Sequence, residues 1–208
     1  KKAFFFSYPD TSNSWTDFSD SSYRYRLDIS PRTKAATKIK LSIEGFFNNV
    51  SMNMSDTFRA YLRSSTSPYA KVDSAIAVVD EDSLAGIFNI ISAPAGSYYI
   101  QIRHRNTIET WSASPVSFPA SSYDFTTSAS QAYGSNMVLK GSKWCIYSGD
   151  VNQDGVVDGS DGSLIDNDAF NFVSGYVSAD LNGDYFVDGS DASVCDNNAF
   201  NFIGVMRP

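Results

Sequence analysis

The sequence predicts a mainly β protein, with an antiparallel β-sandwich over residues 1–148 and a small α-helical unit over residues 149–208. Three observations support this division. Apolar and polar residues alternate along much of the first part, with turn sequences between the runs. The last part contains one acidic loop written twice, and each copy leads into a helix-like tail. With 208 residues, of which 42% are hydrophobic, the chain can also bury a substantial core.

The alternating runs are the evidence for strands. Ile39 and Leu41 face one way, while Lys38 and Lys40 face the other. Successive side chains of a strand point to opposite faces, so each run predicts a strand with one buried face. We expect seven or eight strands through Leu139 in an antiparallel sandwich, with no helix among them. The other clear runs are residues 58–63, 72–78 and 98–103.

The first residues contain the most apolar strand candidate. Phe4, Phe5 and Phe6 are adjacent, so they place apolar groups on both faces of a strand. Such a strand is either buried in its own domain or added to a groove on a neighbouring subunit. The second alternative would join copies of the chain into filaments.

The repeated loop has the oxygen spacing of a calcium site. Residues 150–161 recur as residues 180–191, with Asp or Asn at loop positions 1, 3, 5, 9 and 12 in both copies. Ca²⁺ binds six to eight oxygens at about 2.3–2.6 Å, so short side chains must converge on it from several directions. We predict two Ca²⁺ ions, each also bound by the main-chain carbonyl at position 7. The expected ligands are Asp150, Asn152, Asp154, Val156, Asp158 and Asp161, and then Asp180, Asn182, Asp184, Phe186, Asp188 and Asp191.

The two loops differ at position 6, where the chain turns sharply. The first loop has Gly155 there and the second has Tyr185. A non-glycine residue at positive φ is disfavoured by about 1 kcal/mol or more. We therefore expect the second site to be the weaker, with Asp161→Ala more damaging than Asp191→Ala.

Residues 150–203 resemble the dockerin repeats of secreted bacterial and archaeal proteins. Each Asp-x-Asn-x-Asp loop is followed by one helix and closed by Asp at position 12, as in that family. The resemblance implies two loop–helix units packed antiparallel. It also implies a partner such as a cohesin module, contacted through loop positions 10 and 11, which here are Gly159-Ser160 and Gly189-Ser190.

The first part carries a second resemblance. Residues 94–105 are similar to the late hairpin of immunoglobulin-like modules in bacterial surface proteins. Together with residues 67–74, residues 103–111 and the acidic tail, they resemble C-terminal regions of exported Bacteroidetes- and Chlorobi-type proteins. The resemblance implies an extracellular or cell-surface location and brings no catalytic residues with it.

Charge is distributed unequally along the chain. Residues 150–208 hold eleven aspartates and one arginine, whereas the net charge of the whole chain is −7. An acidic chain is a poor candidate for nucleic acid, and no run of eighteen apolar residues is present to span a membrane. A start at Lys1 without methionine is expected of a processed, exported chain.

Candidate catalytic groups are few. His104 is the only histidine, and alternation places it with apolar neighbours, so a packed core histidine is the preferred interpretation. A glycosidase needs two carboxylates facing one cleft, and no pattern pairs Glu44, Glu81 and Glu109. We predict a protein that is not an enzyme.

Two further residue types leave alternatives open. Cys145 and Cys195 are either a disulfide, as suits an exported protein, or two small buried hydrophobic residues. Trp15, Trp111 and Trp144 are candidates for stacking on sugar rings.

The leading hypothesis is a non-catalytic structural or assembly subunit at the cell surface, stabilised by calcium. Its partner would be another copy of the chain or another surface protein. The alternatives are a docking module for a cohesin-like partner and a carbohydrate-binding accessory module. In each case we expect the calcium unit to pack on the sandwich through its apolar helix positions. These positions are Leu164, Ile165, Ala169 and Phe172, and then Val194, Cys195, Ala199 and Phe202.

Overall fold

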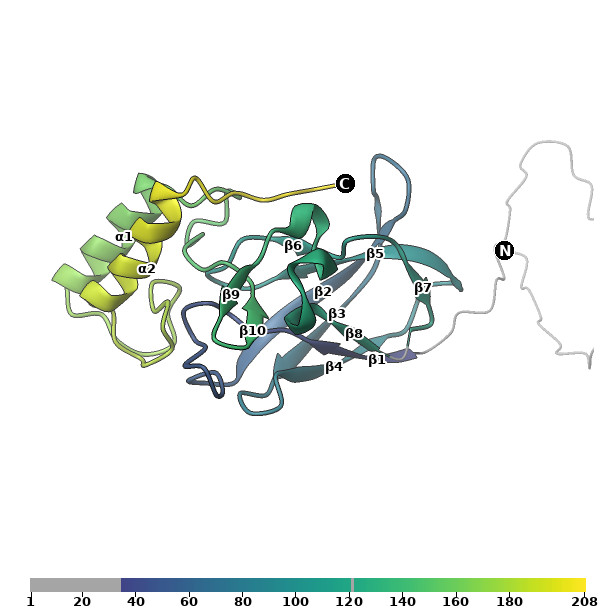
Figure 1. Ribbon diagram of the computed structural model, residues 1–208, viewed down its shortest axis with the longest axis horizontal. Coiled ribbons are helices and arrows are strands. Elements are labelled where there is room, and N and C mark those ends of the chain that lie inside the picture. Colours follow the sequence, from purple (N-terminus) through teal and green to yellow (C-terminus); the bar gives the residue numbers. More distant parts are fainter. Residues whose placement is uncertain (1–34, 121) are drawn as a thin grey trace, which may run out of the picture. The chain divides into compact units, whose positions relative to one another are not determined.

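The computed structural model describes residues 35–120 and 122–208. In these ranges the chain forms ten β-strands and two α-helices, so it is mainly β (Figure 1). No helix in the described part is long and apolar enough to cross a membrane. Phe4, Phe5, Phe6 and Trp15 lie outside the described residues, and the expectations about them stay predictions.

Two sheets make up the sandwich. The three-stranded sheet has the order β4-β1-β8, with β1 antiparallel to β4 and parallel to β8. The larger sheet has the order β3-β2-β5-β6, its strands pair antiparallel, and β7 also pairs with β5. The strands are β1 (Ala35–Lys40), β2 (Asp56–Ser64), β3 (Lys71–Val79), β4 (Ala85–Ile90), β5 (Gly96–Arg103), β6 (Thr110–Trp111), β7 (Val116–Phe118) and β8 (Ser122–Asp124).

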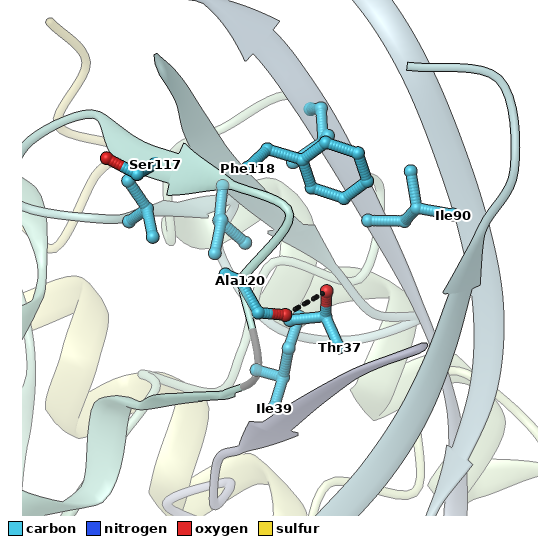
Figure 2. A pocket seen from close by; sticks show the side chains of 9 residues that line it. Thr37, Ile39, Ile90, Ser117, Phe118 and Ala120 are labelled. Atoms are coloured by element: carbon cyan, nitrogen blue, oxygen red, sulfur yellow. Dashed lines mark hydrogen bonds between the residues drawn. The ribbon is translucent and has the colours of Figure 1, made fainter. Parts of the chain in front are cut away.

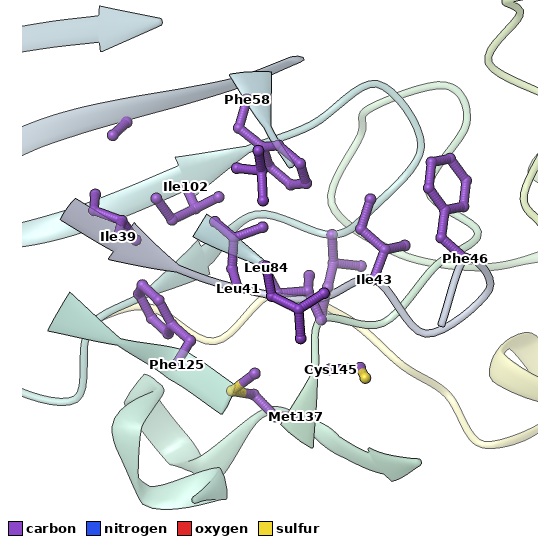
Figure 3. Packing of buried hydrophobic residues seen from close by; sticks show 14 of the residues in the cluster. Ile39, Leu41, Ile43, Phe46, Phe58, Leu84, Ile102, Phe125, Met137 and Cys145 are labelled. Carbon is purple, nitrogen blue, oxygen red and sulfur yellow. The ribbon is translucent and has the colours of Figure 1, made fainter. Parts of the chain in front are cut away.

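The core lies between the sheets. Ile39 of β1, Phe58 of β2 and Ile102 of β5 are fully buried (Figure 3). Phe88 of β4 is fully buried as well. The alternation expected for β2 and β5 is therefore confirmed. Burying side chains of this size contributes roughly 1.5–3 kcal/mol each, so this layer is a main source of stability.

The strand β3 presents its faces differently from the other runs. Ile76 and Val78 are 55% and 58% exposed, because the register puts Ile76 beside Arg59 on the outer face of the sheet. The smaller Ala75 and Ala77 lie on the core side. A shift of one residue exchanges the two faces of a strand, and the periodicity of an apolar run does not specify which face is buried.

The segment after β8 contains short helices that the sequence did not indicate. Eight strands have formed by Asp124, and three 3-10 helices follow before the small hairpin of β9 and β10. Polar side chains start two of these turns. Asp124 accepts a hydrogen bond from Thr126 N at 2.9 Å, and Ser128 accepts one from Ser130 N at 3.2 Å. The elements are η1 (Phe125–Thr127), η2 (Ala129–Gln131), η3 (Tyr133–Ser135), β9 (Val138–Lys140) and β10 (Lys143–Cys145).

The repeated segments form two matching helices, α1 (Gly159–Phe170) and α2 (Gly189–Phe200). The chain after α2 pairs with the first loop through Val156 and Gly204, and the chain after α1 pairs with the second loop through Ser174 and Phe186. The C-terminal end of each helix therefore lies beside the loop that begins the other helix. The two helices run antiparallel and are related by an approximate two-fold axis.

The helices contact the sandwich through fewer residues than expected. Ile165 and Cys195 are fully buried and belong to the same core as the sandwich residues. The expectation is wrong for Leu164, Phe172 and Phe202, which are 43%, 90% and 89% exposed. Leu164 lies one residue from the buried position and so faces another side of the helix. Both phenylalanines follow the last helical turn at positive φ, which directs them away from the core.

Both cysteines are buried free thiols, which matches the interpretation as small hydrophobic residues. Burial raises the pKa of Cys145 to about 11 and that of Cys195 to about 12. Neither is a reactive thiolate at neutral pH. Residues 35–120 and 122–208 belong to one compact unit, and the predicted domain boundary at residues 148 and 149 stays a prediction.

Gly45 allows the closest approach of the second loop to the sandwich. A Cβ atom at this position would overlap the carbonyl oxygen of Leu181. Gly45→Ala should therefore lower the free energy of unfolding by about 1–3 kcal/mol or more, because the loop backbone must move. Gly159→Ala is the control, since a Cβ there meets no atom. Urea denaturation measures both, and equal stability of the two variants would contradict the assigned contact.

Candidate metal centres

The first repeated loop is closed by backbone hydrogen bonds to its aspartates. Asp161 Oδ1 accepts from the N–H groups of Val151 and Asn152 at 2.8 and 3.1 Å, and its Oδ2 accepts from Asp158 N–H. Asp158 in turn caps α1 by accepting from Ser160 N–H at 2.7 Å. Asp161 at loop position 12 and Asp158 at position 9 thus link the loop to the first turn of its helix through hydrogen bonds.

The second loop repeats these bonds. Asp191 accepts from Leu181 and Asn182 N–H at 2.7 and 3.1 Å, and Asp188 accepts from Ser190 N–H at 2.7 Å. At positions 9 and 12 the structure thus gives corresponding residues of the two loops the same partners. The identical register found in the sequence produces two equivalent loop conformations.

The first loop contains a carboxylate oxygen that fits a cation. Asp150 Oδ1 is buried and has no hydrogen-bond partner. Burial, followed by repulsion from Asp161 and Asp154, raises the pKa of Asp150 to about 6. A divalent cation would oppose this shift, since it stabilises the ionised form of every carboxylate around it. Burial also raises the pKa of Asp180 and Asp191 in the second loop.

Other features of the loops differ from a formed calcium cage. In the described ranges, no group of three or more Asp, Glu, His or Cys side chains is arranged to hold a metal ion. The amides of Asn152 and Asn182 turn their nitrogens toward Asp154 and Asp184, at 3.0 Å in each case. Either asparagine could act as a ligand only through its oxygen. The two calcium ions and their twelve expected ligands therefore stay predictions.

Backbone strain is equal in the two loops, which the sequence analysis did not foresee. Tyr185 adopts the expected positive φ of 69°, where the first loop has Gly155 at 95°. At position 4 the roles are reversed, with Gln153 at 63° and Gly183 at 77°. Each loop thus holds one glycine and one larger residue in the left-handed region. The positive φ of Tyr185 is therefore no reason to expect weaker calcium binding at the second loop.

A buried ionic network joins the sandwich to the second loop. The Asp56 side chain is fully buried, and its Oδ2 lies 3.0 Å from Arg105 Nε and 2.9 Å from His104 Nε2, although the histidine N–H is poorly aligned with it. Tyr176 donates its hydroxyl to the other oxygen of Asp56. Arg105 continues to the second loop, where it donates to the carbonyl of Asp180 at 3.3 Å. Position 1 of the second loop is therefore held by the sandwich.

The protonation states of this network follow from its surroundings. Burial alone would raise the pKa of Asp56, but His104, Tyr176 and Arg105 outweigh it and hold the pKa well below its usual value. Burial lowers the pKa of His104, against the opposing effect of Asp56. At neutral pH the network therefore consists of an aspartate anion, an arginine cation and a neutral histidine.

A second contact between the parts involves α2. The buried Asn198 donates to Glu44 Oε2 at 2.6 Å and to the carbonyl of Ser148 at 2.9 Å. Sequence reasoning considered Glu44 only as a candidate catalytic group and did not consider Asn198. No local pattern marks this pair, because the two residues meet only when the helix docks.

Several candidate binding residues are enclosed. His104 has no exposed side-chain surface and stacks on Phe58, with ring centroids 4.5 Å apart. Trp111 is only 5% exposed and donates its indole N–H to Glu109. Neither can lie against a ligand in this state. Trp144 is half-buried and packs on the core.

An apolar pocket lies between the sheets near Thr37 and Phe118 (Figure 2). Its volume is about 10 Å³, which is close to the space of one water molecule. Thr37 Oγ1 donates to the carbonyl of Ala120 at 2.9 Å across its margin. This pocket is a packing gap with no room for a substrate.

Comparison with known proteins gave only structural likenesses. No protein-family model matches the chain, and no curated protein matches it either. One similar structure is the type II cohesin–X–dockerin complex of Acetivibrio cellulolyticus with a C-terminal interface mutant, at a TM-score of 0.49 and 17% identity over 81% of this chain and 99% of that chain. The corresponding complex with an N-terminal interface mutant gives a TM-score of 0.42 and 18% identity, over 81% and 97%. At these TM-scores the likeness assigns neither a fold family nor a partner.

Asp56→Asn tests the ionic network. At neutral pH it should lower the free energy of unfolding by about 3–5 kcal/mol, because Arg105 loses its buried counter-ion. The folded pKa of Asp56 lies below the unfolded value of about 3.9, so its contribution is present above that pH and lost as the pH falls through the folded pKa. The difference between wild type and variant should therefore shrink in strong acid.

Urea denaturation at neutral pH and below about pH 3 provides the measurement. Asp82→Asn, at an exposed site, is the matched control and should change stability by less than about 0.5 kcal/mol. A pH-independent loss in Asp56→Asn would contradict the ionic role.

Proposed function

We propose that this protein is a non-catalytic, exported assembly module, stabilised by calcium, that holds a protein partner through the exposed ends of its helix pair. The observation that carries the proposal is the exposure of four aromatic side chains. Phe170, Phe172, Phe200 and Phe202 are 82–90% exposed. Clustered apolar surface of this kind is typical of protein–protein interfaces.

The exposed residues form two equivalent sites. The first apolar end consists of Phe170, Phe172 and Phe186, since the chain after α1 pairs with the second loop. The second apolar end consists of Phe200, Phe202 and Val156, for the same reason.

The approximate two-fold symmetry supports an assembly role. Each chain would carry two similar docking ends, so another copy could bind at each of them and extend an assembly. A separate surface protein, such as a cohesin-like module, could instead use one end. The dockerin resemblance of residues 150–203 favours this second form of the proposal.

Calcium contributes rigidity in this proposal. Asp158 and Asp188 start the helices that carry the aromatic residues, and the loops hold the two helix ends in place. The acidic loops repel themselves without a cation, so metal binding and the order of the docking ends should be coupled. Calcium loops in extracellular modules bind at about 10⁻⁴–10⁻³ M, so a role of these loops in calcium binding suits an extracellular location.

Calcium binding can be tested by native mass spectrometry and calorimetry. We expect two ions per chain, with Asp161→Ala and Asp191→Ala each weakening its own site by tenfold or more, or about 1.4 kcal/mol. The two losses should be comparable, because backbone strain is balanced between the loops. Asp82→Ala is the control. A chain that retains no calcium would contradict the stabilising role, whatever its partner.

Docking can be tested with two defined partners. Self-association is measured by sedimentation velocity in calcium over a wide range of concentration, and binding of a purified type II cohesin module is measured by calorimetry. Phe172→Ser combined with Phe202→Ser should weaken the observed interaction by more than tenfold, since aromatic anchors dominate interfaces. Val50→Ser removes an equally exposed apolar side chain outside the helix pair and should change nothing. A protein that stays monomeric and also fails to bind the cohesin module would contradict the proposal.

A further inference from the structure

The outer face of the larger sheet carries rows of basic and aromatic side chains. The register places Arg59 directly opposite Arg103 and Tyr61 opposite Gln101. Arg63 lies in the next outward row, opposite Tyr99. These residues come from β2 and β5, whose other faces fill the core. The sandwich therefore holds them on a rigid, twisted surface.

This face is positively charged, whereas the chain as a whole has a net negative charge. Arg59 and Arg103 face each other across two strands, a placement of like charges that is unfavourable without an anion nearby. Within the described residues, no carboxylate lies within ion-pairing distance of Arg59 or Arg63. Glu109 pairs with Arg103 at 3.5 Å and with Arg207 at 2.9 Å. The face thus keeps a positive excess on a chain of net charge −7.

Aromatic rings support the cations. The guanidinium of Arg63 lies 5.3 Å from the ring centre of Tyr61 and 5.8 Å from that of Trp111. Arg59 and Lys71 also lie against Tyr61, at 5.9 and 5.5 Å. Such contacts limit the freedom of long basic side chains and hold them ready for a ligand. They also explain why Trp111 itself is covered.

Two hollows open on this face. One has a volume of about 300 Å³ and is lined by Arg59, Tyr61 and Arg103 among others. The second has a volume of about 390 Å³ and is lined by Arg63, Gln101, Arg103 and Glu109 among others. Arg103 borders both, so one ligand chain could occupy the two hollows in succession. Volumes of this size are typical of small-ligand sites.

We propose that this face binds an acidic polysaccharide, whose sugar units carry carboxylate or sulfate groups. The arginines would pair with the anionic groups, and guanidinium suits the planar geometry of a carboxylate. The hydroxyls of Tyr61 and Tyr69, which line the two hollows, supply hydrogen-bond partners for neutral sugar hydroxyls. Gln101 is buried and accepts a hydrogen bond from Arg63, so it positions the arginine. A nucleic acid fits less well, because Glu109 and the acidic chain repel a dense row of phosphates. This site is separate from the docking ends of the helices.

The probe for this proposal is trigalacturonate, with its methyl ester as the uncharged counterpart. Calorimetry should show binding of the acid and at least tenfold weaker binding of the ester. Arg59→Gln and Arg63→Gln should each weaken binding by at least fivefold, and increasing salt should weaken the wild type. Lys38→Gln removes the same charge from an exposed position on the other sheet and should leave binding unchanged. Thermal unfolding of each variant shows that the fold is kept.

Three comparisons make the outcome decisive. A sulfated trisaccharide tests whether sulfate replaces carboxylate, and binding of either acidic sugar supports the site. Equal or tighter binding of a thymidine oligonucleotide or of a glutamate peptide would overturn the assignment to sugars. Retained trigalacturonate binding in Arg59→Gln combined with Arg63→Gln would also overturn it, because the sugar would then be held elsewhere, for example through calcium at the loops. No binding of any acidic sugar by the wild type would overturn it outright.

Discussion

The buried carboxylate of Asp56 is the constraint on which the arrangement of the described residues depends. An unpaired charge in a core is strongly destabilising, so Asp56 requires Arg105 and the polar groups around it. Arg105 also donates to the carbonyl of Val177, just before the second loop, and to that of Asp180, the first residue of the loop. The same arginine therefore satisfies the core charge and fixes the loop. Asn106 reinforces this contact by donating to the Asp180 carbonyl at 2.7 Å.

Three consecutive residues at the end of β5 have different roles. Arg103 faces outward and borders the two hollows of the basic face. His104 faces inward and packs on Phe58. Arg105 then leaves the strand and reaches the acidic loop. Alternation thus separates Arg103 on the basic face from His104 in the core, and the turn after β5 directs Arg105 to the loop.

The helix pair is built from two copies of one loop–helix sequence, which form two similar halves. The ninth-position aspartate of each loop caps its own helix, and the chain after each helix pairs with the other loop. This exchange encloses Ile165 and Cys195 but leaves the terminal phenylalanines outside. Phe172 and Phe202 follow the helix ends at positive φ, which directs them away from the core, whereas Phe170 and Phe200 end the helices on an exposed side.

Local sequence patterns predicted the elements better than their contacts. The alternation in β2 and β5 was sufficient because one set of side chains in each strand is plainly apolar. In β3 both faces are apolar, and only pairing with β2 determined that Ile76 points outward beside Arg59. The positive φ of Tyr185 could be predicted from its place at position 6 of the loop. The positive φ of Gln153, which balances it in the first loop, is seen only in the backbone angles of the structure.

The sequence by itself determined the helix after each repeated loop, the common register of the two loops and the buried faces of β2 and β5, because these depend on spacing within a few residues. Only the tertiary structure decided that Asp56 meets Arg105, that Asn198 meets Glu44, and that the basic rows gather on one face. These pairs are far apart in the chain. Which residues meet depends on the burial of charged groups and on strand register, and no local sequence pattern specifies either of them.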